Sequence, residues 1–223
     1  MEISSKVMGR LTRYRALLID YFPKEKTYVF SHELAAIVGL SASQVRRDLM
    51  CLGYFGVPRY GYEIVELIKH LNLVLDASKQ HNVAVVGAGN LGRALMTFLE
   101  SRRATLKIVA AFDDDPSMAN RVINGVPCHA METMEQLIAL RHIRIAILCV
   151  PGSAAQRVTD RLIRAGIKGI LNFAPVPIRI PAGIALEEID VTSSLERVAF
   201  FTTSHAPVLR ERRTPQKRTG ARN

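Results

Sequence analysis

Three glycines directly after an apolar run are the residues whose spacing most clearly suggests chemistry. The run extends from Val83 to Val86, and residues 87–92 follow it as G-x-G-x-x-G. In such a turn the first glycine allows a sharp bend, the second lets a pyrophosphate approach the backbone, and the third lets the next helix lie close to the strand. The helix N-terminus attracts the phosphates. The pattern predicts a dinucleotide-binding site made by Gly87, Ala88, Gly89, Asn90, Leu91 and Gly92.

A carboxylate further along the chain completes this pattern. The apolar segment 106–112 predicts a second strand, and Asp113 follows it, about twenty residues after the last glycine. An acid at this place accepts hydrogen bonds from an adenosine ribose and repels a 2′-phosphate, so we expect NAD(H) rather than NADP(H). Alone, G-x-G-x-x-G is also compatible with a plain strand-to-helix turn. With both strands and the acid it indicates a Rossmann-like α/β domain, while Asp114 and Asp115 are expected to form a solvated turn.

The first eighty residues show a different pattern, that of short helices. Apolar residues recur at helical spacing in 10–22, and a second helix is predicted from its N-cap Ser31 to Gly39. Ser41 and Gln44 form a predicted capping box for a third helix. Two helices joined by a short glycine-containing turn are typical of a helix-turn-helix.

The third predicted helix has an outer face suited to DNA. Its apolar residues Val45, Leu49 and Leu52 recur at i, i+4 and i+7 and are expected to face inward. Arginine and glutamine near a helix N-terminus suit the base edges and phosphates of a major groove. Neighbouring arginines are also common on solvated surfaces, but their position behind the capped turn favours DNA contact. The predicted contacts are Ser43, Gln44, Arg46 and Arg47.

Residues 53–62 have the turn residues and aromatics of a β-hairpin wing, and Arg59 at its tip is predicted to reach a minor groove. A linker whose aromatics pack on the domain explains these residues equally well. Residues 63–77 then predict a helix that bridges two domains.

The formal net charge of +10 is unevenly distributed. Residues 207–223 contain six Lys/Arg against one Asp/Glu and almost no apolar residues, which predicts a disordered basic tail. Overall basicity is therefore weak support for specific DNA binding. No apolar run has bilayer-spanning length and no signal-peptide pattern is present, so we expect a cytoplasmic protein without a membrane partner. The cysteines Cys51, Cys128 and Cys149 match neither a disulfide set nor a metal motif and are expected in the core.

The chain resembles the Rex family of redox-sensing transcriptional repressors over nearly all of its length except the tail. The matching stretches are residues 44–49, 87–95, 112–113, 150–156 and 165–176. The resemblance implies an N-terminal winged helix-turn-helix domain, a C-terminal Rossmann-like domain that binds NADH or NAD⁺, and a homodimer that exchanges its C-terminal helices. It also implies repression at double-stranded, palindromic operator DNA that is relieved when NADH rises.

On this basis we expect a DNA-binding domain over residues 1–79 and a nucleotide-binding domain over 80–206. The latter includes the exchanged helix 192–204, for which Ser193 and Glu196 form a capping box, and the tail follows at 207–223. Val150 and Pro151 end a predicted strand at the carboxyl edge of the sheet, where a dinucleotide lies.

Two positions depart from the family pattern at the cofactor. Phe98 stands where relatives have a tyrosine that hydrogen-bonds an aspartate matching Asp190, and Ala16 stands where they have an arginine. The resemblance therefore places Phe98 and Asp190 at the cofactor, with Asp190 lacking two partners. An unpaired carboxylate attracts cationic nicotinamide, so we expect weaker discrimination between NADH and NAD⁺.

Two other functions are left open by the sequence. A small NAD-dependent oxidoreductase would share the Rossmann-like domain, but neither a substrate domain nor a clear acid–base pair follows it, so we expect no catalysis and no metal site. The segments 150–151 and 165–169 also resemble the CoA-binding domains of acyl-CoA ligases. Asp113 favours a ribose hydroxyl instead, and titration with NADH and CoA separates the two.

Overall fold

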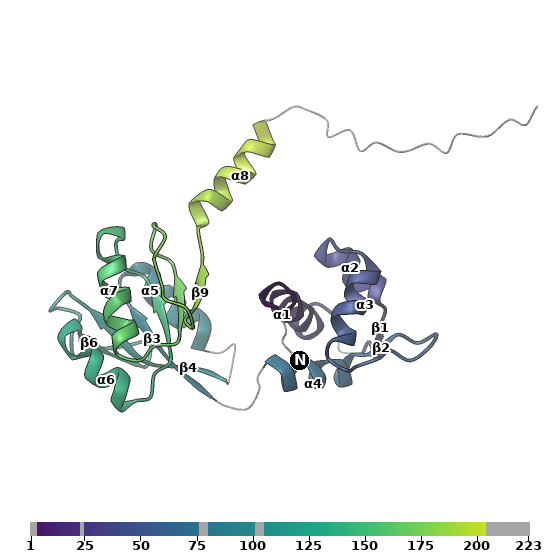
Figure 1. Ribbon diagram of the computed structural model, residues 1–223, viewed down its shortest axis with the longest axis horizontal. Coiled ribbons are helices and arrows are strands. Elements are labelled where there is room, and N and C mark those ends of the chain that lie inside the picture. Colours follow the sequence, from purple (N-terminus) through teal and green to yellow (C-terminus); the bar gives the residue numbers. More distant parts are fainter. Residues whose placement is uncertain (1–3, 23–24, 76–79, 101–104, 204–223) are drawn as a thin grey trace, which may run out of the picture. The chain divides into compact units, whose positions relative to one another are not determined.

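The computed structural model describes residues 4–22, 25–75, 80–100 and 105–203. The chain forms two compact units (Figure 1). One contains Met1–Asn82 together with Phe98–Lys107, and the other contains Val83–Thr97 and Ile108–Asn223. Each unit has its own hydrophobic core.

The N-terminal unit is a small helical domain with a two-stranded sheet. Its helices are α1 (Ser5–Asp20), α2 (Ser31–Val38), α3 (Ala42–Met50) and α4 (Ile64–Leu75), and its strands are β1 (Tyr28–Val29) and β2 (Tyr62–Glu63). One apolar face of each helix is buried in the shared core, and α1 lies against both α3 and α4. The largest fully buried side chains of this core are Leu11, Tyr14, Leu34, Leu49, Leu67 and Leu71.

The turn between α2 and α3 has the predicted helix-turn-helix geometry. Gly39 ends α2 in the left-handed conformation with φ +70°, which costs a glycine little. Ser41 caps α3, and its Oγ accepts the N–H of Gln44 at 3.2 Å. The second half of the predicted capping box is wrong, because the Gln44 side-chain oxygen accepts a hydrogen bond from Arg47, and its amide nitrogen donates to Asp48. The predicted N-cap of α2 is also wrong by one residue: Phe30 holds that position, and its N–H donates to Glu33.

The wing differs from the predicted hairpin. β2 pairs antiparallel with β1, a strand that precedes the helix-turn-helix and that the sequence pattern did not indicate. The wing itself is a tight loop closed by one bridge between Val57 and Gly61. Arg59 lies at its tip, exposed and with φ +70°.

The C-terminal unit is a seven-stranded sheet. Its strands are β3 (His81–Val86), β4 (Leu106–Asp113), β5 (Val122–Ile123), β6 (Val126–Ala130), β7 (Ile145–Leu148), β8 (Gly169–Asn172) and β9 (Ala185–Glu188). The spatial order is β5-β6-β4-β3-β7-β8-β9, in which β5 pairs antiparallel with β6. The pairs β3–β7, β4–β6, β7–β8 and β8–β9 are parallel. The helical elements between them are α5 (Asn90–Glu100), the 3₁₀ turn η1 (Met131–Thr133), α6 (Met134–Leu140) and α7 (Gly152–Arg164).

This order creates a switch point at the centre of the sheet. From β3 the chain moves outward through β4 to β6, then returns to β7 on the other side of β3 and continues through β8 to β9. The Rossmann fold has this order, and ligands bind where it reverses, outside the carboxyl ends of the two central strands. The ends of β3 and β7 therefore mark the expected site.

The last described element is α8 (Val191–Thr203), which follows β9 and is largely exposed (Figure 1). Its N-cap differs from the predicted one. The Asp190 side chain caps the helix by accepting the N–H of Ser193, so Ser193 lies inside the first turn. The predicted tail 207–223 lies outside the described residues. In the described part of the chain, none of the helices combines the length and apolar character needed to cross a membrane.

Candidate functional site

The glycine-rich turn is closely packed at two of its glycines and open at the third. Gly87 has φ +94°, and a Cβ on it would lie 2.3 Å from the carbonyl oxygen of Cys149. A Cβ on Gly92 would lie 2.0 Å from the carbonyl oxygen of Gly87. A Cβ on Gly89 would meet no described atom within 4 Å. Folding therefore requires Gly87 and Gly92, whereas the space at Gly89 lets a ligand approach the backbone.

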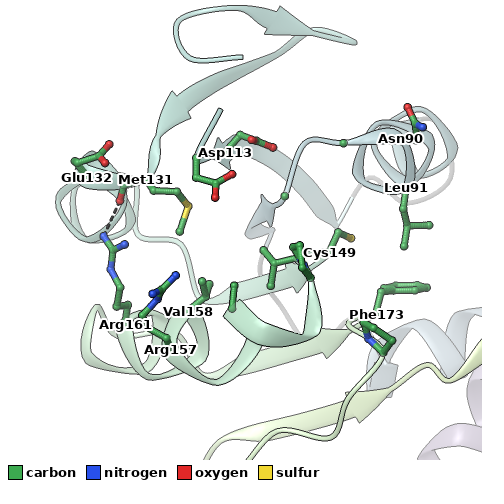
Figure 2. A pocket seen from close by; sticks show the side chains of 17 residues that line it. Asn90, Leu91, Asp113, Met131, Glu132, Cys149, Arg157, Val158, Arg161 and Phe173 are labelled. Carbon is green, nitrogen blue, oxygen red and sulfur yellow. Dashed lines mark hydrogen bonds between the residues drawn. The ribbon is translucent and has the colours of Figure 1, made fainter. Parts of the chain in front are cut away.

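A cavity of about 620 Å³ opens beside this turn, at the switch point of the sheet (Figure 2). Its volume is within the range of small-molecule sites. Its walls come from the carboxyl ends of β3, β4, β6 and β7, from one side of α7 and from the loop after β8. The lining residues are Gly87, Gly89, Asn90, Leu91, Asp113, Asp114, Met131, Glu132, Cys149, Val150, Pro151, Ala154, Arg157, Val158, Arg161, Phe173 and Pro175.

Asp113 is half-buried at the end of β4, on the cavity wall. Its Oδ2 accepts the N–H of Ala88 at 2.6 Å, and its Oδ1 accepts the N–H of Asp115 at 2.9 Å. These bonds hold the carboxylate in one orientation beside the glycine-rich turn. Each carboxylate oxygen can accept more than one hydrogen bond, so both remain able to bind the hydroxyls of a ligand.

Two arginines of α7 reach the cavity from the opposite side (Figure 2). Arg161 forms a bidentate ion pair with Glu135, at 2.6 and 2.8 Å, and also donates to the carbonyl oxygen of Met131. The Arg161 hydrogen bonds hold the pKa of the Glu135 carboxyl below its usual value. Arg161 thereby fixes one end of the cavity wall. Arg157 is exposed and lies one turn earlier on the helix.

Most of the predicted cofactor residues line this one cavity. Seven of the eleven do so: Gly87, Gly89, Asn90, Leu91, Asp113, Val150 and Pro151. Ala88 and Gly92 support the turn instead, since Ala88 is fully buried with its N–H on Asp113 and Gly92 packs under Gly87.

The other two predicted residues, Phe98 and Asp190, are not among the cavity's lining residues. Phe98 is an exposed side chain on α5, and Asp190 lies at a smaller hollow of about 260 Å³ beyond β8 and β9. Asp190 does not lack partners as expected, because both the N–H and the Oγ–H of Ser193 donate to it. These hydrogen bonds hold the pKa of Asp190 below its usual value.

The sequence patterns missed several residues of the cavity. The far wall is made by Met131 and Glu132 after β6 and by Arg157, Val158 and Arg161 on α7. Asp114, expected only in a solvated turn, also lines it. The i, i+3, i+4, i+7 spacing of Ala154, Arg157, Val158 and Arg161 would have indicated a common helix face, but not that this face borders a ligand site.

Cysteines also differ from the expected core positions. Cys128 is buried, but Cys51 is exposed and Cys149 lines the cavity. Burial raises the pKa of the Cys149 thiol to about 11, which keeps it protonated at neutral pH. Among the described residues, no cluster of histidine, cysteine and acidic side chains is arranged to hold a metal ion.

The predicted DNA-contacting residues lie along α3 and the wing, and they differ in exposure and in the hydrogen bonds they already make. Ser43, Arg46, Arg47 and Arg59 are exposed. Arg46 donates to Ser31 Oγ at 3.1 Å, which links α3 to α2, and Arg47 makes a 3.3 Å hydrogen bond to Gln44. Gln44 is half-buried, and its amide is engaged with Asp48.

A buried carboxylate fixes α3 from behind. Asp48 is 2% exposed and accepts hydrogen bonds from Arg10 at 2.6 and 2.7 Å, from the Tyr14 hydroxyl at 2.8 Å and from Gln44 at 2.8 Å. Burial alone would raise the pKa of Asp48, but these donors outweigh it and lower the pKa below its usual value. The network ties α3 to α1, so it sets the orientation of the exposed face of α3.

A helix-turn-helix unit and a Rossmann-like cavity therefore occur in one chain. Residues 2–49 match a family described as putative DNA-binding protein N-terminus, and residues 78–176 match one described as CoA binding domain. The redox-sensing transcriptional repressor Rex of Clostridioides difficile (strain 630) is 37% identical over 200 residues, which are 90% of this chain and 95% of the relative. The chain belongs to the Rex family.

Solved structures of the Rex family agree with the fold. A crystal structure of RSP, a Rex-family repressor, superimposes with a TM-score of 0.82 at 35% identity, covering 91% of this chain and 95% of that one. RSP in complex with β-NAD⁺ and operator DNA superimposes with a TM-score of 0.80 at 36% identity, covering 91% and 93%. These matches establish the winged helix-turn-helix domain followed by a Rossmann-like domain.

Proposed function

We propose that this chain is a DNA-binding transcriptional repressor whose hold on operator DNA is controlled by NADH and NAD⁺. The observation that supports this most directly is the cavity at the switch point, with open space at Gly89 and with Asp113 held beside the glycine-rich turn, in a chain that also contains a helix-turn-helix. RSP, its Rex-family relative, has been solved with NADH and, separately, with NAD⁺ and operator DNA. We propose that the protein acts in the cytoplasm, where it would meet its operator DNA.

NAD(H) fits the cavity better than NADP(H). Asp113 would accept the adenosine ribose hydroxyls, and its charge, with that of Asp114, repels a 2′-phosphate. The nearby glycine-rich turn would hold the pyrophosphate at the start of α5. When bound, the dinucleotide supplies a nicotinamide ring that is cationic when oxidised and neutral when reduced.

The apolar part of the cavity would distinguish these two charge states. Leu91 and Phe173 line the cavity at some distance along the wall from the arginines (Figure 2), and Val150 is also a lining residue. Apolar surroundings penalise a cation more than a neutral ring, so this part favours NADH. Phe98 and Asp190 remain our candidates for residues that modulate the preference.

Control of DNA binding needs the two nucleotides to prefer different arrangements of the protein. Moving a two-state equilibrium almost wholly from one state to the other takes about 5.5 kcal/mol of differential binding. A homodimer with two ligand sites divides this requirement between them. NADH must prefer the arrangement that does not bind the operator.

A second copy of the chain is the partner we propose for α8. Five apolar residues of this helix are more than half exposed: Val191, Leu195, Val198, Phe200 and Phe201. Deleting residues 192–206 should therefore weaken the dimer, whereas deleting 211–223 should not. A full-length protein that is monomeric at micromolar concentration by light scattering would contradict this assembly.

Regulation rather than catalysis is the function that we propose for the cavity. Among the described residues, the lining contains no histidine, lysine or tyrosine, and burial raises the pKa of its cysteine, so only its carboxylates could transfer a proton there. Measurable hydride transfer to a carbonyl substrate would favour an oxidoreductase instead.

The decisive experiment is a fluorescence-anisotropy titration of palindromic operator DNA, repeated with NADH and with NAD⁺. We expect NADH to release the DNA and NAD⁺ to leave it bound. Arg47→Ala should cost about 1–3 kcal/mol of operator affinity while nucleotide binding is unchanged. Unaltered operator affinity in that variant would refute the role of α3, and binding of CoA in preference to NADH would refute the role of the cavity.

A further inference from the structure

Arg157 is the cavity residue whose role the glycine-rich turn and Asp113 leave unexplained. It lies on the side of α7 that borders the cavity, together with Ala154, Val158 and Arg161. Figure 2 shows its side chain extending into the half of the cavity that Asp113 and Met131 border. Asn90, Leu91 and Phe173 border the other half (Figure 2). Arg157 therefore lies on the adenosine side of the proposed site.

The two cavity arginines differ in what their guanidinium groups already bind. Arg161 is occupied by Glu135 and by the carbonyl oxygen of Met131. Among the described residues, Arg157 makes neither an ion pair nor a hydrogen bond. The Arg161 guanidinium therefore stabilises the cavity wall, whereas the planar guanidinium of Arg157 is available to a ligand.

The surroundings of Arg157 decide what part of a ligand it can take. Three carboxylates line the cavity, Asp113, Asp114 and Glu132, and they disfavour an additional phosphate on the ribose. Phe173 is the cavity's aromatic side chain, and it lies at the other end. An adenine ring near Met131 and Val158 would therefore have no aromatic neighbour in the lining. A guanidinium can replace one, because it is planar and stacks on aromatic faces.

We propose that Arg157 is an adenine-binding residue that stacks its guanidinium on the base of the dinucleotide. This inference rests on the proposed NAD(H) function of the cavity and adds a determinant for its adenosine half. Because that half is the same in both redox forms, Arg157 contributes equally to the affinity for NADH and NAD⁺. It sets the strength of nucleotide binding and not the redox preference.

The test compares three variants by calorimetric titration with ADP-ribose, NADH and reduced nicotinamide mononucleotide, which lacks the adenosine half. Arg157→Ala should weaken ADP-ribose and NADH binding about three- to tenfold and leave the mononucleotide unchanged. Arg157→Lys keeps the charge but loses the planar face, so most of the loss should persist. Arg164→Ala, an exposed arginine of the same helix outside the cavity, is the matched control and should bind all three ligands as the unaltered protein does.

Each other outcome has a distinct meaning. Unchanged ADP-ribose affinity in Arg157→Ala overturns the inference alone. Full affinity in Arg157→Lys with a steep salt dependence assigns the residue to phosphate attraction and also overturns it. A preference of the unaltered protein for NADPH that Arg157→Ala abolishes would make it a 2′-phosphate site. If the unaltered protein binds neither ADP-ribose nor NADH, the proposed function fails and this inference fails with it.

Discussion

Asp48 behind the recognition helix and Asp113 in the nucleotide cavity are both aspartates held by hydrogen bonds, but in opposite ways. Asp48 is almost fully buried and accepts from three side chains on two helices. Asp113 is half-buried, accepts from two backbone N–H groups and faces a cavity. Side-chain donors and burial leave Asp48 no access to a ligand. Backbone donors orient Asp113, and its oxygens can still accept hydrogen bonds from a ligand. The first arrangement stabilises a fold, and the second prepares a binding site.

The same distinction separates the glycines of one turn, and here we expect the largest effect. In Gly92→Ala the new Cβ meets the carbonyl oxygen of Gly87, so β3 and α5 must move apart. We expect a loss of about 3 kcal/mol or more in the free energy of unfolding of the Rossmann-like unit. Chemical denaturation followed by circular dichroism measures it.

Gly89→Ala is the matched control, because its Cβ enters open space. It should leave stability within about 0.5 kcal/mol and weaken nucleotide binding instead. Equal losses of stability in Gly92→Ala and Gly89→Ala would contradict the conclusion that Gly92 is required for packing and Gly89 for ligand binding.

Asp48→Ala should produce the next largest effect, on the N-terminal unit. It leaves Arg10 and Tyr14 without their common acceptor, and fully buried pairs broken in this way typically cost 3–5 kcal/mol. The Arg10 side chain is 24% exposed and can turn toward water, so we expect about 2–3 kcal/mol. Hydrogen exchange of α1 and α3 amides measures it, since a two-unit chain need not unfold in one step. Asp20→Ala, at an exposed aspartate of α1, is the control and should change little.

The same network gives the N-terminal unit an acid-sensitive stability. Because the pKa of Asp48 is lower in the folded protein than in the unfolded chain, its contribution is complete above the unfolded value of about 4. It is lost as the pH falls through the folded pKa. Asp48→Asn should flatten this part of the stability profile, and an unchanged acid dependence would show that other carboxylates dominate.

Asp113→Ala should act on the ligand more than on the fold. Removing the carboxylate should weaken NADH binding by about 1–2 kcal/mol and narrow any preference over NADPH. Asp113→Asn keeps one carbonyl oxygen to accept a backbone N–H, so it separates the loss of charge from the loss of the turn's support. Equal affinities of the unaltered protein for NADH and NADPH would reject the assigned role.

How far the sequence predicts this molecule depends on whether a feature is local. The glycine-rich turn, the end of α2 at Gly39 and the cap at Ser41 are decided by neighbouring residues, and these predictions are confirmed. The β5–β6 hairpin was equally local, since Asn124-Gly125 between apolar residues is a strong turn signal, but it was overlooked.

Features that depend on pairing between distant segments were not predictable. Asp48 meets Arg10 across 38 residues, and β1 meets β2 across the whole helix-turn-helix. Arg157 joins the cavity only because the topology brings α7 beside the ends of β4 and β6. The types of these residues do not indicate their partners, because charged residues and short apolar segments occur throughout the chain.

Asp190 is a third carboxylate to compare with Asp48 and Asp113, and Phe98→Tyr tests its role. We expect the smallest effect here, because Asp190 already accepts two hydrogen bonds from Ser193. The family pattern pairs a tyrosine at position 98 with this aspartate, but Ser193 already supplies two hydrogen bonds to it. A tyrosine hydroxyl would thus add a third donor instead of a first one. Phe98→Tyr should reduce the attraction of Asp190 for cationic nicotinamide only slightly, and raise the NADH-over-NAD⁺ affinity ratio about twofold, roughly 0.5 kcal/mol.

Ser193→Ala gives the opposite perturbation, because it removes the hydroxyl donor and should lower the same ratio. Calorimetric titration of both nucleotides into the three proteins measures the two changes against one reference. Opposite shifts would show that Asp190 tunes redox preference in proportion to its hydrogen bonding. A ratio unaffected by either substitution would place Asp190 with Asp48, as a carboxylate with a structural role: Asp190 would cap α8 and would not meet a ligand.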